Sequence, residues 1–197
     1  MREIKVMTIR ISKVFFAAAF FFGAAFASAQ ASSGRIDFAL TYSATEANIV
    51  GSGNHFWLNG GTAELAAKAY GGLGIVANIT GSHQANTGLG VPLDLLTTTF
   101  GPRYTWMSPK HTFTIFGQGL IGEAHGFRGL FPDPGGPNTD ALSFASQVGG
   151  GVDIGISRYV SLRVIQADWL RTQLPNSTTN VQNDLHLGAG IVFHTAN

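Results

Sequence analysis

Five residues are of the types from which a hydrolytic site can be built. Ser82 and His83 are adjacent, His125 follows later, and Glu123 or Asp168 could orient a histidine base. Such a set would activate the serine hydroxyl as a nucleophile. The six histidines are scattered, however, and none has the i, i+4 spacing of paired metal ligands. We therefore expect no catalytic site, no metal site and no cofactor.

The charged residues form a second set, and they alternate with apolar side chains. In the stretch 96–106, LTTTFGPRYTW, Leu96, Phe100 and Trp106 share one set of alternate positions, and Arg103 lies in the other. A period of two is typical of a β-strand with one apolar and one polar face. The polar faces carry four basic and four acidic residues, which we expect to form an ion network: Arg35, Asp37, Glu64, Lys68, Arg103, Asp153, Arg163 and Asp168.

The alternation predicts eight strands. Their expected ranges are 35–42, 62–69, 73–80, 96–106, 112–121, 141–154, 160–172 and 185–193. In the seventh range, unbroken alternation would place Asp168 on the apolar face and Trp169 on the polar face. One extra residue near Ile165 and Gln166, a β-bulge, would restore both to their proper faces. We therefore predict a bulge at that point.

The connections between these strands alternate strictly between long and short. The long ones are 43–55, 81–92, 122–140 and 173–182, and the short ones are 71–72, 107–111 and 157–159. Outer-membrane barrels sort their loops in this way, and closure leaves no unpaired strand edge in lipid. The sequence therefore predicts an all-β, eight-stranded antiparallel up-and-down transmembrane barrel with four long outer loops. The alternative is a soluble lipocalin-like barrel, with its apolar face inside.

Residues 1–29 have the pattern of a cleaved export signal. Basic residues precede the apolar run VFFAAAFFFGAAFA, which ends at the small-x-small site Ala27-Ser28-Ala29. The run is shorter than the roughly twenty residues of a membrane helix. We expect a signal peptide at 1–29 and a barrel domain at 30–197, with cleavage specified by Ala27 and Ala29. The domain keeps eight basic and ten acidic residues, a formal charge of −2, and has no basic patch that favours nucleic acid.

Three stretches carry a family resemblance. GPRYTW at 101–106, GGGVDIGISRYVSLRVIQADWLRT at 149–172 and HLGAGIVF at 186–193 resemble the outer-membrane β-barrel family that includes the opacity proteins and the membrane domain of outer-membrane protein A. The resemblance implies export through the Sec pathway to the outer membrane of a Gram-negative-type bacterium. It also implies outer-membrane lipid, periplasmic chaperones and the barrel assembly machinery as partners, and a monomeric barrel.

The last stretch also resembles the C-terminal signal that the barrel assembly machinery reads. His186, Gly188, Ile191 and Phe193 give its order of polar, glycine, hydrophobic and aromatic residues. That signal usually ends at the aromatic residue, whereas 194–197 follow it in this chain.

The interior of an eight-stranded barrel is just wide enough to be filled by side chains. The three-residue turn 157–159 places Asp153 directly opposite Arg163, so we predict a cross-strand ion pair. A filled, charged lumen favours a plugged barrel with a structural or surface-interaction role through its outer loops, whose external ligand the sequence does not name. The alternatives are a small gated pore and, less favoured, a lipid hydrolase or acyltransferase at the barrel rim.

Overall fold

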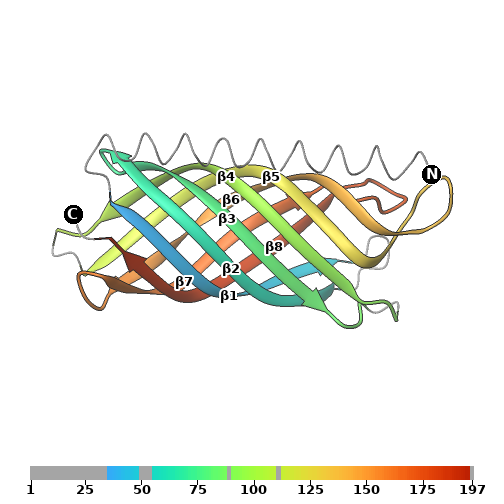
Figure 1. The fold of residues 1–197 in the computed structure, drawn as a ribbon, viewed down its shortest axis with the longest axis horizontal. Helices are drawn as coiled ribbons and strands as arrows, with labels where there is room; N and C mark the ends of the chain where they lie inside the picture. The colour runs from blue at the N-terminus through green and yellow to red at the C-terminus, as the bar shows by residue number, and fades with distance from the viewer. Residues whose placement is uncertain (1–34, 49–54, 88–89, 110–111, 196–197) are drawn as a thin grey trace. The chain divides into compact units, whose positions relative to one another are not determined.

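The computed structural model describes residues 35–48, 55–87, 90–109 and 112–195. The expected signal peptide, with Ala27 and Ala29, lies outside these ranges. Within them, no helix is long and apolar enough to cross a membrane. The described chain is a set of β-strands joined by turns and loops (Figure 1).

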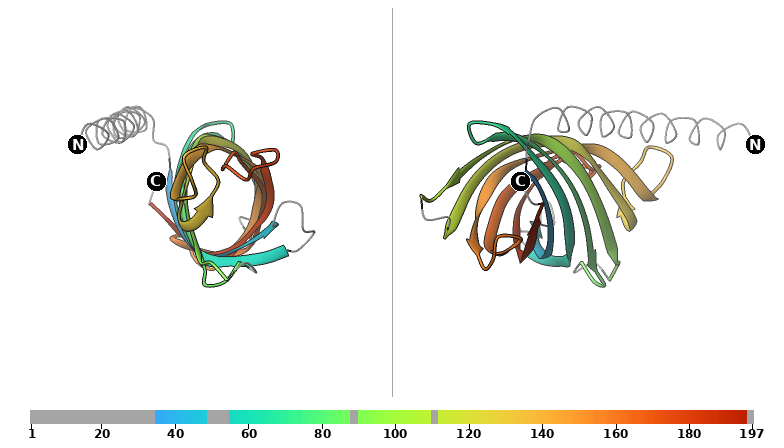
Figure 2. Two further views of the ribbon diagram at one scale, coloured as in Figure 1. Left: turned by 90° about the vertical axis from the view of Figure 1, so that its right-hand side faces the viewer. Right: turned by 60° about the vertical axis from the view of Figure 1, so that its left-hand side comes forward.

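All eight predicted strands are present, and they form one closed antiparallel barrel in chain order. Figure 2 shows the closed ring when the barrel is viewed from the long-loop end. Strand β1 pairs with β2 on one side and with β8 on the other, so the barrel has no free edge. The strands are β1 (Ile36–Asn48), β2 (His55–Tyr70), β3 (Leu73–Gln84), β4 (Leu93–Met107), β5 (Phe113–Phe131), β6 (Asn138–Gly155), β7 (Val160–Thr172) and β8 (Gln182–His194).

The strands extend further toward the long-loop end than the alternation predicted. The expected loop 122–140 is mostly a β-hairpin, because β5 continues to Phe131 and β6 begins at Asn138. The register shifts between Phe127 and Phe131, where Arg128 adopts a left-handed backbone conformation with φ of 58°. Such a bulge and the glycines of this stretch hide the period of two in the sequence. The predicted bounds of the long loop, 122–140, are therefore wrong. The tip of the hairpin is 132–137.

The short connections all lie at one end of the barrel, and the long ones lie at the other (Figure 1). The short-turn end also holds the two described ends of the chain. There the amide of Thr195 donates to the carbonyl of Ile36 at 2.9 Å. The two ends therefore differ in the way the sequence predicted.

The outer surface of the barrel is apolar, and its interior is charged at the level of Arg103 and Arg163. Leu40, Ile79 and Phe100 are about half exposed on the outside, whereas Arg103 and Arg163 are buried inside. A soluble lipocalin-like barrel has the opposite arrangement. This sidedness excludes the lipocalin-like alternative and suits a barrel surrounded by lipid.

The predicted bulge in β7 is confirmed. Val152 of β6 pairs with Ile165, but the next residue, Asp153, pairs with Arg163, so Val164 is the extra residue. Val164 and Ile165 both face outward, one position earlier than the sequence indicated. As a result, Asp168 returns to the interior and Trp169 to the outside, where it is 49% exposed.

Candidate functional site: the charged interior

Glu64 on β2 is the centre of the interior, where it accepts hydrogen bonds from two arginines. Arg103 of β4 donates to its two carboxylate oxygens at 2.7 and 2.5 Å. Arg163 of β7 donates from Nη1 to Oε1 at 2.9 Å. Their side chains are only 1–7% exposed, so the ion pairs are buried. Separating any of these three strands would leave a buried charge without its partner, which is costly. The three side chains therefore link three strands that are not neighbours in the barrel.

The predicted contact between Asp153 and Arg163 is present. The two residues are direct cross-strand partners, and the guanidinium donates to both carboxylate oxygens, at 2.8 and 3.2 Å. Arg163 also donates to the side-chain carbonyl of Gln166 at 2.8 Å. Planar, forked hydrogen bonding of this kind is what a guanidinium provides and an ammonium does not. The side chain of Arg163 therefore has a defined position across the barrel.

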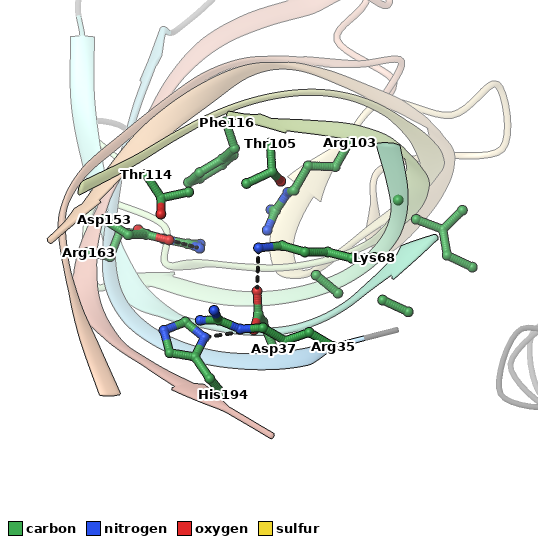
Figure 3. A pocket seen from close by; sticks show the side chains of 14 residues that line it. Arg35, Asp37, Lys68, Arg103, Thr105, Thr114, Phe116, Asp153, Arg163 and His194 are labelled. Carbon is green, nitrogen blue, oxygen red and sulfur yellow. Dashed lines mark hydrogen bonds and ion pairs between the residues drawn. The ribbon is translucent and has the colours of Figure 1, made fainter. Parts of the chain in front are cut away.

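Phe116 lies between the two arginines. Its ring centroid is 4.2 Å from Cζ of Arg103 and 4.5 Å from Cζ of Arg163, a cation–π arrangement (Figure 3). In the sequence, Phe116 is an apolar exception on a polar face, and the structure shows it buried in the interior. The ring has room because the neighbouring inward position of β6 is Gly151, where an added Cβ would lie 2.7 Å from Cζ of the ring.

We expect Gly151→Ala to lower the free energy of unfolding by about 1–3 kcal/mol, because the new methyl group overpacks the interior. Its Cβ would also lie 2.5 Å from the carbonyl oxygen of Ile165. The measurement is urea unfolding of the refolded protein in lipid vesicles. Gly119→Ala is the matched control, since a Cβ at Gly119 meets no atom within 4 Å. Equal stability of the two variants would contradict the packing argument.

Asp168 is inside, as predicted, but its partners are amides. Its Oδ1 accepts from Gln118 at 3.2 Å, and its Oδ2 accepts from Gln147 at 2.9 Å and from Gln166 at 2.7 Å. Gln118 in turn accepts from Arg103. Alternation in the sequence places Gln118 and Gln147 on the polar face, whereas Gln166 is brought inside by the bulge in β7.

A second cluster surrounds Asp37 at the short-turn end (Figure 3). Its carboxylate is 2.8 Å from Nε of Arg35, 3.6 Å from Nζ of Lys68 and 2.7 Å from Nδ1 of His194. Arg35, Lys68 and Asp37 were predicted to be interior residues. His194 was treated as the start of an overhang, but it is the last residue of β8 and also bonds Ser161 at 2.7 Å.

The residues of the expected assembly signal divide between the two faces of β8. His186 is buried in the interior, where its Nδ1 is 2.9 Å from the hydroxyl of Thr45. Ile191 and Phe193 face outward, and Phe193 stacks on Phe38 of β1 with ring centroids 6.4 Å apart. Gly188 pairs with Ser43. Their role in assembly stays a prediction.

The candidate hydrolytic residues are not brought together. Ser82 is buried inside the barrel while His83 projects outside, because adjacent strand residues face opposite sides. His83 bonds Asp94 at 2.6 Å at the rim, and Arg128 bonds the same carboxylate. Among the described residues, no group of three or more side chains could hold a metal ion.

The charged interior leaves little free space. The cavity beside Arg103, Arg163 and Asp37 has a volume of about 20 Å³. A single water molecule needs roughly 10–15 Å³ by the same kind of measure. The free space in this cavity is therefore close to that of one water molecule.

No family model and no curated protein sequence matches the chain. Solved structures do match: Neisserial surface protein A aligns with a TM-score of 0.58 at 12% identity, over 82% of this chain and 97% of that protein. The attachment invasion locus protein Ail of Yersinia pestis aligns with a TM-score of 0.57 at 13% identity, over 82% of this chain and 99% of that protein. This chain has the outer-membrane β-barrel fold. Ail in complex with the heparin analogue sucrose octasulfate matches the barrel as well, with a TM-score of 0.56 at 13% identity, over 82% of this chain and 99% of that protein.

Proposed function

We propose that the protein is a monomeric barrel in the outer membrane of a Gram-negative-type bacterium, exported through the Sec pathway with residues 1–29 as its signal. The apolar outer surface and the closed strand order support this location, because lipid offers backbone groups no hydrogen-bond partners. Periplasmic chaperones and the barrel assembly machinery would deliver it, reading the last strand through His186, Gly188, Ile191 and Phe193.

We further propose that the lumen is plugged and that the protein acts through its outer loops, in a structural or surface-interaction role. The observation that carries the plug is the side-chain network of Glu64, Arg103 and Arg163, which leaves a cavity of only about 20 Å³. The names of the attachment invasion locus protein Ail and of Neisserial surface protein A, which describe attachment and a surface location, support a role at the cell surface. A gated pore would require this network to come apart.

One outward element with a defined structure is the β5–β6 hairpin. Its strands pair up to Phe131 and Asn138, and Asp133 holds its tip by accepting bonds from Gly135 at 3.1 Å and from Asn138 at 2.9 Å. A tip with this many internal bonds presents one shape to a partner, which lowers the entropy lost on binding. The proposal includes no catalytic step.

Surface labelling tests this orientation. We expect an epitope tag inserted between Gly135 and Gly136, at the tip of the hairpin, to bind antibody on intact cells. The same tag inserted between Gly71 and Gly72, in the opposite short turn, should bind antibody only after the outer membrane is permeabilised. Both sites are turns with left-handed glycines, Gly72 and Gly136, so they tolerate insertion similarly. Labelling of the 71–72 tag alone on intact cells would reverse the proposed orientation.

A further inference from the structure

A second cavity lies at the long-loop end of the barrel, apart from the ion network. Its volume is about 330 Å³, near the lower limit of the roughly 300–1,000 Å³ range of small-molecule sites. Leu58, Leu95, Phe131 and Leu174 line it, and each is at most 7% exposed. These side chains come from β2, β4, β5 and the loop after β7, and they form one apolar cluster. The interior of the barrel thus changes from charged to apolar toward its outer mouth.

One carboxyl group lines this apolar cavity. Asp184, on β8, is 4% exposed, and its Oδ1 has no hydrogen-bond partner among the described residues. The other buried acids in the barrel are paired: Glu64 and Asp153 accept from guanidinium groups, and Asp168 accepts from three amides. A buried polar atom without a partner destabilises the fold, and a ligand that donates a hydrogen bond to Oδ1 would remove this cost.

We propose that this cavity binds a small apolar molecule with a cationic amine head, and that Asp184 receives the amine. The ammonium would donate to Oδ1 of Asp184, while the hydrocarbon part packs against Leu58, Leu95 and Leu174. A charge-assisted hydrogen bond in an apolar setting is stronger than a neutral one. A fatty acid would instead place a second negative charge beside the carboxylate. The volume accommodates a short chain but not a phospholipid, so the ligand is a free amine.

The site is independent of the proposed surface role. It uses none of the residues of the ion network, and of the hairpin tip only Pro132 is among the described residues that line it. The described residues that line it belong to β1, β2, β4, β5, β7 and β8 and to the loops that follow β3, β5 and β7.

Calorimetric titration of hexylamine into the protein in lipid nanodiscs tests the proposal, with empty nanodiscs subtracted. We expect saturable binding that is tighter for hexylamine than for hexan-1-ol and weakest for hexanoate. Asp184→Asn, which keeps the shape of the side chain, should weaken hexylamine binding about tenfold or more and change hexan-1-ol binding little. Leu174→Trp should abolish binding of all three probes by filling the cavity.

Asp140→Asn is the matched control. It removes the same charge from an exposed position on β6, where the Asp140 side chain is 66% exposed, and it should leave hexylamine binding unchanged. Heat-modifiable gel mobility confirms that each variant is folded. The proposal is overturned if hexylamine shows no saturable binding, if folded Asp184→Asn binds it as tightly as the unaltered protein, or if hexanoate binds as tightly as hexylamine.

Discussion

Replacing Arg163 by alanine is expected to lower the free energy of unfolding by about 3–5 kcal/mol, because the substitution leaves the buried carboxylate of Asp153 without its guanidinium partner. Asp153 would lose both of its hydrogen bonds from the guanidinium, and Glu64 would lose one of its two arginines. The ring of Phe116 would also lose one of the two cations beside it. Truncation at this position therefore breaks several interactions at once.

Urea unfolding of the refolded protein in lipid vesicles, followed by tryptophan fluorescence, measures this effect. Arg158→Ala is the matched control, because it makes the same change in the exposed turn between β6 and β7, where Arg158 stacks on its neighbour Tyr159. We expect the control to change stability by less than about 0.5 kcal/mol. An unfolding midpoint of Arg163→Ala equal to that of the unaltered protein would show that the interior pairs contribute nothing.

In a planar lipid bilayer, we expect the folded protein to give no discrete current steps. Arg103 and Arg163 both donate hydrogen bonds to Glu64, and Arg103 stacks on the ring of Phe116. The cavity beside the two arginines has room for about one water molecule. If the lumen is plugged as proposed, ions find no open path at this level. The double variant Arg103→Ala/Arg163→Ala removes both large side chains from this level and should open a path that carries current.

The control for the conductance measurement is Arg158→Ala/Arg171→Ala, which removes two arginines outside the interior. This variant should be as silent as the unaltered protein. Discrete steps from the unaltered protein, with a size or frequency that changes when the interior arginines are removed, would support the gated pore in place of the plug. Gel mobility confirms folding in every case.

Alternation along single strands was enough to place the charged residues of the interior. Glu64, Arg103 and Arg163 occupy inward positions by parity alone, and the short turn between β6 and β7 sets Asp153 against Arg163. Both deductions are local, since the side-chain period is two and a hairpin turn determines its own register. Even the bulge in β7 followed from parity, because a buried carboxylate and an outward tryptophan required it.

The contacts across the barrel could not be predicted in the same way. Glu64 and Arg163 are 99 positions apart in the chain and lie on strands that are not neighbours. Whether they meet depends on how far the strands are staggered around the closed barrel. This stagger cannot be deduced from the sequence of any single strand. Asp184 was missed for a simpler reason: the predicted eighth strand began one residue after it, whereas β8 begins at Gln182. His194 was missed because the C-terminal pattern was read as ending at Phe193.

The pairing of the first strand with the last determines when the barrel can close during folding. Asp37 and His194 are cross-strand partners joined at 2.7 Å, yet 157 positions separate them along the chain. Until β8 arrives, a partly assembled sheet has two open edges that can pair with other chains and aggregate. Contacts between such distant segments also form slowly. We therefore expect the hydrogen bond between Asp37 and His194 at this seam to be among the last contacts to form during folding.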